Sequence, residues 1–533
     1  MKIITNGKNS GIASFIKTHY FSILRMVIVV ISLIIMLRYA NGRSLWVDEL
    51  WTISFTGIDQ SWAEMFDNFI ADATSNPPLF YIIAALWLRI VPYGAFWLRL
   101  ISIIFAAIGI YLIGNVAGKI YERDGKDYVA VFATLFASTS WFFVTQGAFS
   151  FRSYGLLFLL STLYVYVYIL RTQRHTGVAL GILLGLLAAL LGYTHYFGLF
   201  VPASLFICDL VLLKHKVLKW QHMLSYILAA ALYLPFFIPI FLRVVAQSGN
   251  FWAEPASFIR LVWLFRMLVS SSDLVGALFI FGSVAGVVIM ISIIFENRLV
   301  VSALLGHSAF TEYRKTTVPL SSILFAAQVF TVALTVGMVF IYSRFINPNG
   351  SIFVNRYFIA ILPQLLIVSA ISATWLIENF IIYLKMHGKL LFLICICIVS
   401  IPMIGNFYAE VNRFATTYHH PFRELAEWIY QREDAHNPDT LIVTHAPARG
   451  FSYLLTQGGQ RPPIHIAGVR SWNAYTYKYH VDLTVENHIQ WNIIYRFRGR
   501  VPRNTLSILE RYYDLISTYN KWGETIYVYQ RVQ

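Results

Sequence analysis

The chain has 533 residues, of which 58% are hydrophobic and only 13% are charged, and its mean hydropathy is +0.62. About a quarter of the residues of a soluble domain are charged, so this composition excludes an ordinary soluble protein and indicates a membrane protein with many spans. The net charge of +15 would suit a nucleic-acid binder, but the basic residues lie in short loops between apolar runs. This bias is typical of the cytoplasmic loops of inner-membrane proteins, so we expect no nucleic-acid partner.

Eleven apolar runs approach or exceed the 20 or so residues that a membrane-spanning helix needs. They lie at 21–40, 96–118, 128–148, 153–170, 177–194, 196–213, 222–242, 272–295, 318–342, 353–377 and 389–407. A shorter run at 78–91 predicts a re-entrant or tilted helix. We therefore expect 11 to 13 transmembrane helices in an all-α membrane domain.

The distribution of Lys and Arg predicts the orientation of the chain. Residues 1–20 form a basic N-terminal segment, which the positive-inside rule places in the cytoplasm. Residues 21–407 form the transmembrane domain, and an odd number of crossings then places 408–533 outside. This last segment is polar and rich in Tyr, and it predicts a small α/β domain with strands at 440–444, 463–467 and 525–530 and a short helix at 449–456.

The first outer loop, 41–77, contains the acidic pair Asp48-Glu49 directly after the first apolar run. Carboxylates at a membrane surface are costly when desolvated and usually have a function. One hypothesis is that this pair takes a proton from an acceptor hydroxyl. The alternative is that both residues cap a short helix or lie solvated in the loop. The loop ends at Asn76-Pro77-Pro78, where the double proline predicts the start of the next helix.

Two further polar motifs interrupt apolar runs at predicted outer boundaries. The first, at 146–154, contains Arg152 and Tyr154; Arg152 either extends into lipid headgroups or binds a phosphate or a carboxylate. The second contains His195 and Tyr196. His195 is either structural or a ligand for a metal or a substrate hydroxyl.

A final motif, Val354-Asn355-Arg356-Tyr357, places an arginine near the outer end of a helix. The planar guanidinium of Arg suits a phosphate because it donates two parallel charge-assisted hydrogen bonds. We therefore expect Arg356 to bind a phosphate group at the membrane surface.

Taken in order, these motifs resemble those of the GT-C membrane glycosyltransferases of the protein O-mannosyltransferase and lipid A aminoarabinose-transferase type. The resemblance rests on Leu45–Glu49, Asn76–Tyr81, Phe96–Ser102, Gln146–Tyr154, Thr194–Phe197 and Val354–Tyr357. It covers about residues 20–375. The chain departs from relatives at Asn76, where they often have His, and at Gly147, where they often have an acidic residue.

The resemblance implies an enzyme of the cell envelope that uses a sugar on a polyprenyl phosphate and works on the non-cytoplasmic face of the bacterial inner membrane. Asp48 then acts as general base or helps to hold a metal, and Glu49 supports the loop or contacts the acceptor. Arg356, with Arg152 as a second group, binds the donor phosphate. The residues implied to line the substrate cavity are Tyr154, His195, Tyr196, Tyr357 and Asn76.

The sequence leaves several questions open. The donor sugar, the acceptor (a glycan, a lipid or a protein) and the need for a divalent metal ion are not specified. A second hypothesis from a different class is a transporter or flippase of lipid-linked glycans. Such transporters usually contain internal repeats and ionisable residues near the membrane midplane, whereas no repeat is evident here and the charges cluster near the ends of the runs.

Overall fold

The computed structural model describes most of the membrane domain and the strands of the C-terminal segment. The described residues are 9–56, 61–71, 77–92, 94–121, 125–174, 178–214, 220–247, 253–269, 272–294, 320–384, 388–417, 428–429, 431, 440–444, 465–468, 491–496, 510, 513–521 and 524–531. The chain divides into two compact units. The first contains 1–37, 73–80 and 102–411, and the second contains 38–72, 81–101 and 412–533.

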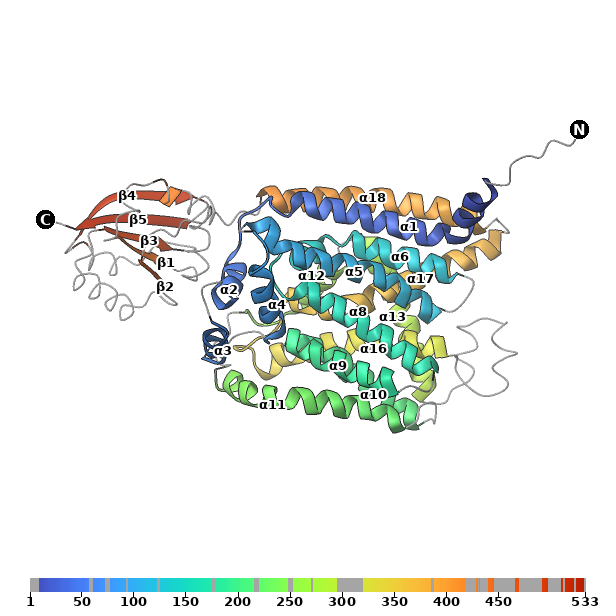
Figure 1. Ribbon diagram of the computed structural model, residues 1–533. Helices are drawn as coiled ribbons and strands as arrows, with labels where there is room; N and C mark the ends of the chain where they lie inside the picture. The colour runs from blue at the N-terminus through green and yellow to red at the C-terminus, as the bar shows by residue number, and fades with distance from the viewer. Residues whose placement is uncertain are drawn as a thin grey trace, which may run out of the picture. The chain divides into compact units, whose positions relative to one another are not determined.

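The first unit is a bundle of long helices (Figure 1). Its principal helices are α1 (Asn9–Tyr39), α5 (Ala95–Tyr121), α6 (Lys126–Ser138), α8 (Tyr154–Arg174), α9 (Val178–Thr194), α10 (Phe200–Lys214), α11 (Leu224–Gln247), α12 (Phe258–Leu268), α13 (Asp273–Ile294), α16 (Leu320–Ile341), α17 (Leu362–Leu384) and α18 (Gly388–Thr417). Shorter helical turns join them: α7 (Trp141–Phe143), η1 (Val144–Ala148), η2 (Tyr196–Leu199), η3 (Trp220–Met223), η5 (Tyr342–Ile346) and η6 (Asn355–Ile361).

Most of these helices are membrane spans by length and composition. Within the described residues, eight are long and apolar enough to cross a bilayer, or up to ten if each of two bent pairs forms one span. A backbone in lipid must satisfy its own hydrogen bonds, which explains why apolar runs of this length are helical. The predicted all-α membrane domain is confirmed, and the number of 11 to 13 crossings stays a prediction.

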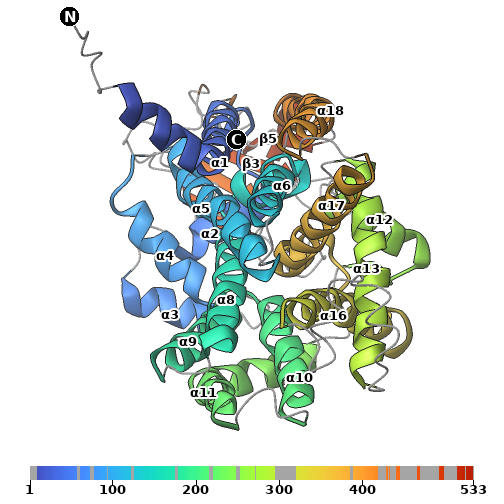
Figure 2. The same ribbon diagram turned by 90° about the vertical axis from the view of Figure 1, so that its right-hand side faces the viewer.

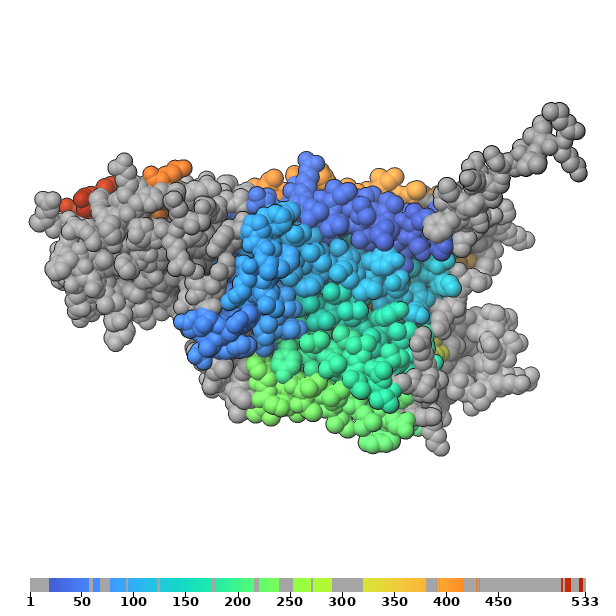
Figure 3. Space-filling model, viewed as in Figure 1, coloured from blue at the N-terminus to red at the C-terminus, as the bar shows by residue number. Residues whose placement is uncertain are grey.

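Burial separates a central helix from peripheral ones. In α17, 89% of the apolar window is buried, and the helix packs against α6, α13 and α16 (Figure 2). In α1 only 22% is buried, and its apolar side chains form part of the surface seen in Figure 3. Exposed apolar residues such as Ile31 and Ile34 suit a helix that faces lipid.

Buried polar side chains connect the helices of this bundle. Arg25 of α1 donates to Asn115 Oδ1 at 2.8 Å and to Thr134 Oγ1 at 3.2 Å, which links α1 to α5 and α6. Arg171 of α8 pairs with Asp209 of α10 at 2.9 Å. Each cation has partners that offset the cost of removing it from water.

The second unit contains α2 (Val47–Thr56), α3 (Trp62–Ala71), most of α4 (Leu79–Leu88) and a five-stranded sheet. The strands are β1 (Thr440–Thr444), β2 (His465–Gly468), β3 (Trp491–Arg496), β4 (Tyr513–Lys521) and β5 (Glu524–Arg531), in the order β2-β1-β3-β5-β4. β1 is parallel to β2 and β3, whereas β5 is antiparallel to β3 and β4.

Three elements were not predicted from the sequence. The helix α12 lies between the apolar runs predicted at 222–242 and 272–295, where no helix was predicted because Arg260 and Arg266 lower the hydropathy; it meets α13 at a bend of 108°. The strands β3 and β4 were also missed, whereas β1 and β5 were predicted within one residue and β2 within two. The short helix predicted at 449–456 lies outside the described residues.

Candidate active site

The first unit brings four of the predicted site residues into one cluster. Arg356 donates from Nε to the hydroxyl of Tyr154 at 2.9 Å, although the two residues are 202 positions apart. The ring of His195 lies 5.9 Å from that of Tyr154 and 4.7 Å from that of Tyr357, between centroids. We call these four residues, together with Arg152, the arginine–tyrosine cluster.

Irregular helical turns position this cluster. Tyr154 begins α8 after a π-helical turn, η1, while Arg356 and Tyr357 belong to the 3-10 turn η6 that leads into α17. Inserted π turns are frequent at functional sites because they shift side chains out of the regular helical register.

Two glycines beside these turns allow a close approach. At Gly147 a Cβ would lie 2.7 Å from the ring of Phe143, and at Gly155 it would lie 2.9 Å from the carbonyl oxygen of Ser102. Glycine at position 147 therefore leaves room for the Phe143 ring. Any larger side chain there requires Phe143 to move.

His195 uses one ring nitrogen to start a helix. Its Nδ1 accepts from the Phe197 N–H at 3.2 Å at the N-terminus of η2. In a neutral imidazole the proton is then on Nε2. This Nε2 is buried and has no hydrogen-bond partner among the described residues, and the side chain is only 2% exposed.

The electrostatic surroundings keep this histidine neutral. Burial lowers the pKa of His195 to about 3, and the positive charges of Arg152 and Arg356 act in the same direction. Arg152 is itself buried, with 8% exposure. The arrangement therefore offers two guanidinium groups together with an uncharged N–H donor, which is a favourable combination for an anion.

The other two predicted cavity residues are Tyr196 and Asn76. The ring of Tyr196 packs against Phe237 of α11, with centroids 6.3 Å apart. Asn76 lies outside the described residues. The two residues predicted to be catalytic, Asp48 and Glu49, belong to the second unit.

Both acidic residues lie in the first turn of α2. A helix N-terminus stabilises negative charge, so this position suits two adjacent carboxylates. Glu49 is fully buried, and its Oε2 accepts from the Trp46 N–H at 3.0 Å. Asp48 is half-buried.

Arg99 is a residue to which the sequence alone assigned no role. It forms a two-pronged ion pair with Glu49, with Nε–Oε1 at 2.9 Å and an Nη2–Oε2 distance of 2.7 Å. Its other N–H groups donate to the carbonyl oxygens of Ala40, Arg43 and Ser44 at 2.8, 3.0 and 2.9 Å. The signal was present, because an arginine between Leu98 and Leu100 needs a buried partner.

Arg43 adds a second cation to this region. Burial lowers the pKa of Arg43 to about 9; the charge of Arg99 acts in the same direction, and Glu49 opposes it. The group therefore stays protonated at neutral pH. Its guanidinium lies 4.3 Å from the ring centroid of Phe414, within the range of a cation–π contact.

Within the described part of the chain, no three His, Cys, Asp or Glu side chains group as ligands for a metal ion. The arginine–tyrosine cluster has a donor set that suits an anion instead, since guanidinium groups donate and do not accept hydrogen bonds.

No family model and no curated protein matches the sequence. Solved structures do match. ArnT from Cupriavidus metallidurans bound to undecaprenyl phosphate is 12% identical, with a TM-score of 0.54 over 94% of this chain and 97% of that one. The apo state of the same protein gives 11% identity, a TM-score of 0.53 and the same coverage. An oligosaccharyltransferase from Archaeoglobus fulgidus is 11% identical, with a TM-score of 0.49 over 98% of this chain and 75% of that one.

The likeness to ArnT extends over nearly the whole of both chains. At this level of identity it concerns the fold, and it agrees with the membrane helices and the C-terminal sheet described above. The protein therefore has the GT-C fold that the order of its motifs predicted.

Proposed function

We propose that this protein is a membrane glycosyltransferase that moves a sugar from a polyprenyl-phosphate carrier to an acceptor hydroxyl on the non-cytoplasmic face. The observation that carries the proposal is the arginine–tyrosine cluster within a membrane-spanning GT-C fold. ArnT, which has the same fold, binds undecaprenyl phosphate in its crystal structure. A lipid-linked phosphate is thus the anion that best suits the cluster.

The cluster has the charge that the leaving phosphate requires. A sugar phosphodiester carries one negative charge, and the released polyprenyl phosphate gains a second when the bond to the sugar breaks. Arg356 and Arg152 supply two positive charges, so their attraction to the phosphate grows along the reaction and stabilises the transition state. The Tyr154 hydroxyl and the His195 Nε2–H add neutral donors.

Asp48 is the proposed general base. Its carboxylate takes the proton from the acceptor hydroxyl as that oxygen attacks the anomeric carbon, and the electron pair of the breaking carbon–oxygen bond leaves with the phosphate. Direct displacement inverts the anomeric centre. Both oxygens of Glu49 are engaged by Arg99, so we assign Glu49 a positioning role that fixes the start of α2 and thereby Asp48.

The test is a transfer assay on purified protein in lipid, with a panel of radiolabelled polyprenyl-phosphate sugars and an envelope extract as acceptor. Asp48→Asn removes the base without changing the size of the side chain, and general-base assistance contributes about 10²–10⁴-fold, so we expect a rate loss in that range. Asp67→Asn, an exposed carboxylate on α3, is the matched control and should transfer at the wild-type rate.

Two results would count against the proposal. Wild-type transfer by Asp48→Asn would remove Asp48 from the mechanism. If no donor is consumed under any acceptor or metal condition while the same lipids cross the bilayer, the protein is a flippase.

A further inference from the structure

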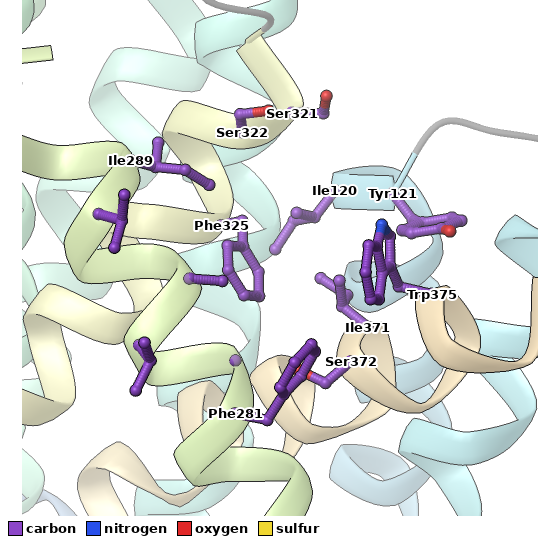
Figure 4. Close-up of a pocket in the computed structure, with 14 residues that line it drawn as sticks. Ile120, Tyr121, Phe281, Ile289, Ser321, Ser322, Phe325, Ile371, Ser372 and Trp375 are labelled. Carbon is purple, nitrogen blue, oxygen red and sulfur yellow. The ribbon is translucent and has the colours of Figure 1, made fainter. Parts of the chain in front are cut away.

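A second feature of the first unit is an apolar cavity of about 330 Å³ between α5, α13, α16 and α17 (Figure 4). Ligand pockets usually measure roughly 300–1,000 Å³, so the volume is in the range of a binding site. Aromatic and branched side chains point into it, among them Phe281, Phe325, Ile371 and Trp375. The function proposed above does not use this cavity.

Two polar groups on the wall, those of Ser372 and Tyr121, have partners within the protein. The Ser372 hydroxyl donates to the Val368 carbonyl oxygen at 2.8 Å, and the Tyr121 hydroxyl donates to the carboxylate of Glu378. A polar ligand would have to break these bonds to gain its own. The lining therefore selects an apolar occupant.

Two glycines fix the helices around the cavity. At Gly282 a Cβ would collide with Ser372 Oγ, and at Gly286 it would lie 2.6 Å from Val329 Cγ2. α13 therefore touches α17 and α16 directly at these glycines, and the cavity lies beside the contact. Because glycine has no side chain at these two positions, the helices approach one another closely, and this contact fixes their spacing.

One side of the cavity is accessible from outside the protein. Val284 and Phe281, both in its lining, are 61% and 42% exposed. They belong to α13, an apolar helix of 22 residues. The surroundings of such a helix in a membrane are hydrocarbon, so an occupant enters from the lipid phase.

The helix α17 leads from the arginine–tyrosine cluster to the cavity. Arg356 precedes this helix in η6, and Ile371, Ser372 and Trp375 lie farther along it. At about 2.0 Å per residue in the 3-10 turn and 1.5 Å in the α-helix, Ser372 is about 25 Å from Arg356. This distance approaches the hydrocarbon thickness of a bilayer, about 30 Å.

We propose that the cavity binds distal isoprene units of the carrier lipid whose phosphate the cluster holds. This inference rests on the proposed function for the identity of the lipid. A long polyprenyl chain anchored at Arg356 descends through the hydrocarbon to the depth of the cavity, whereas a carrier of two or three isoprene units ends well short of it. The cavity thus selects the carrier by its length.

The experiment measures binding of undecaprenyl phosphate and of geranyl phosphate to the purified protein in nanodiscs. Ala285→Phe places a ring in the cavity, and Ala285→Leu fills it less. Val287→Phe is the matched control, because Val287 lies on the same helix, is 47% exposed and does not line the cavity. Melting temperatures of all variants show whether the fold is retained.

We expect wild type and Val287→Phe to bind the long chain at least about tenfold more tightly than the short one, since only the long chain reaches the cavity and packs against its walls. Ala285→Phe should lose this preference by weakening only the long chain, with Ala285→Leu between. An unchanged preference in both Ala285 variants overturns the proposal. The proposal is also overturned if native mass spectrometry detects a bound phospholipid that Ala285→Phe displaces, while the binding of the two carriers does not depend on their chain length.

These outcomes are separable from failure of the proposed function. Length-dependent binding without sugar transfer would refute the glycosyltransferase and leave the cavity proposal standing. Sugar transfer with no effect of chain length on binding would refute the cavity proposal and leave the glycosyltransferase standing.

Discussion

The two ring nitrogens of His195 have different surroundings, and this difference defines the chemistry of the residue. Nδ1 caps η2 by accepting from the Phe197 N–H, while Nε2 is buried without a partner among the described residues. A buried donor without a partner costs about 1–3 kcal/mol. That cost is recovered when an anion such as a donor phosphate accepts the hydrogen bond, which is the role we assign to Nε2.

The low pKa of His195 predicts acid-sensitive stability. The folded pKa, about 3, lies below the unfolded value of about 6.5, so the unfolded chain binds more protons between these values and stability falls as pH decreases through this window. Between pH 8 and pH 5 the loss is about 2 kcal/mol. His195→Asn keeps a capping side chain and cannot titrate, so its melting temperature should fall less over this range. Equal pH dependence in both proteins would show that His195 does not contribute.

At the scale of elements, Glu49 and Arg99 join three segments. The ion pair fixes the start of α2 to α5, and the carbonyls of Ala40, Arg43 and Ser44 fix the preceding loop to the same guanidinium. Both side chains are fully buried. Every N–H of Arg99 has a partner, which is the condition under which a buried ion pair is tolerated.

The chain contains its own control for this pair. Glu49 and Glu64 are both the third residue of a short helix, and each accepts from the backbone N–H of the capping residue, at 3.0 and 2.8 Å. Only Glu49 is buried against an arginine, so Glu49→Gln should cost about 3–5 kcal/mol by leaving Arg99 unpaired. Glu64→Gln, on the surface, should cost under about 1 kcal/mol. Thermal unfolding measures both, and equal losses would contradict a special role for Arg99.

At the scale of the whole molecule, the C-terminal sheet is the part for which the proposed chemistry has no direct use. We propose that it selects the acceptor. Truncation after Thr417, the last residue of α18, should then reduce transfer to the natural acceptor much more than hydrolysis of the donor by water. Both rates come from one assay with labelled donor, with and without acceptor. An equal fall in the two rates would contradict acceptor selection.

The sequence predicted those features that depend on local composition. Apolar runs of about 20 residues have one stable solution in lipid, a helix, and the structure has helices at each of the predicted runs, although 128–148 is bent by 51°. The strands β1 and β5 followed from runs of β-branched and aromatic residues. α12 was missed because two arginines lower the hydropathy of an otherwise apolar segment.

Only the tertiary structure decided which polar groups meet. The sequence placed Arg356 and Tyr154 in separate motifs, and packing of η6 against α8 brought them within 2.9 Å. Likewise, Glu49 and Glu64 are both the third residue of a short helix, and the pairing with Arg99, 50 residues away, is what buries Glu49. The cavity beside Gly282 depends on the packing of four helices. Hydropathy is a sum over neighbours in sequence, whereas the pairing of side chains and the formation of cavities depend on how distant helices pack. The packing therefore determines the candidate site.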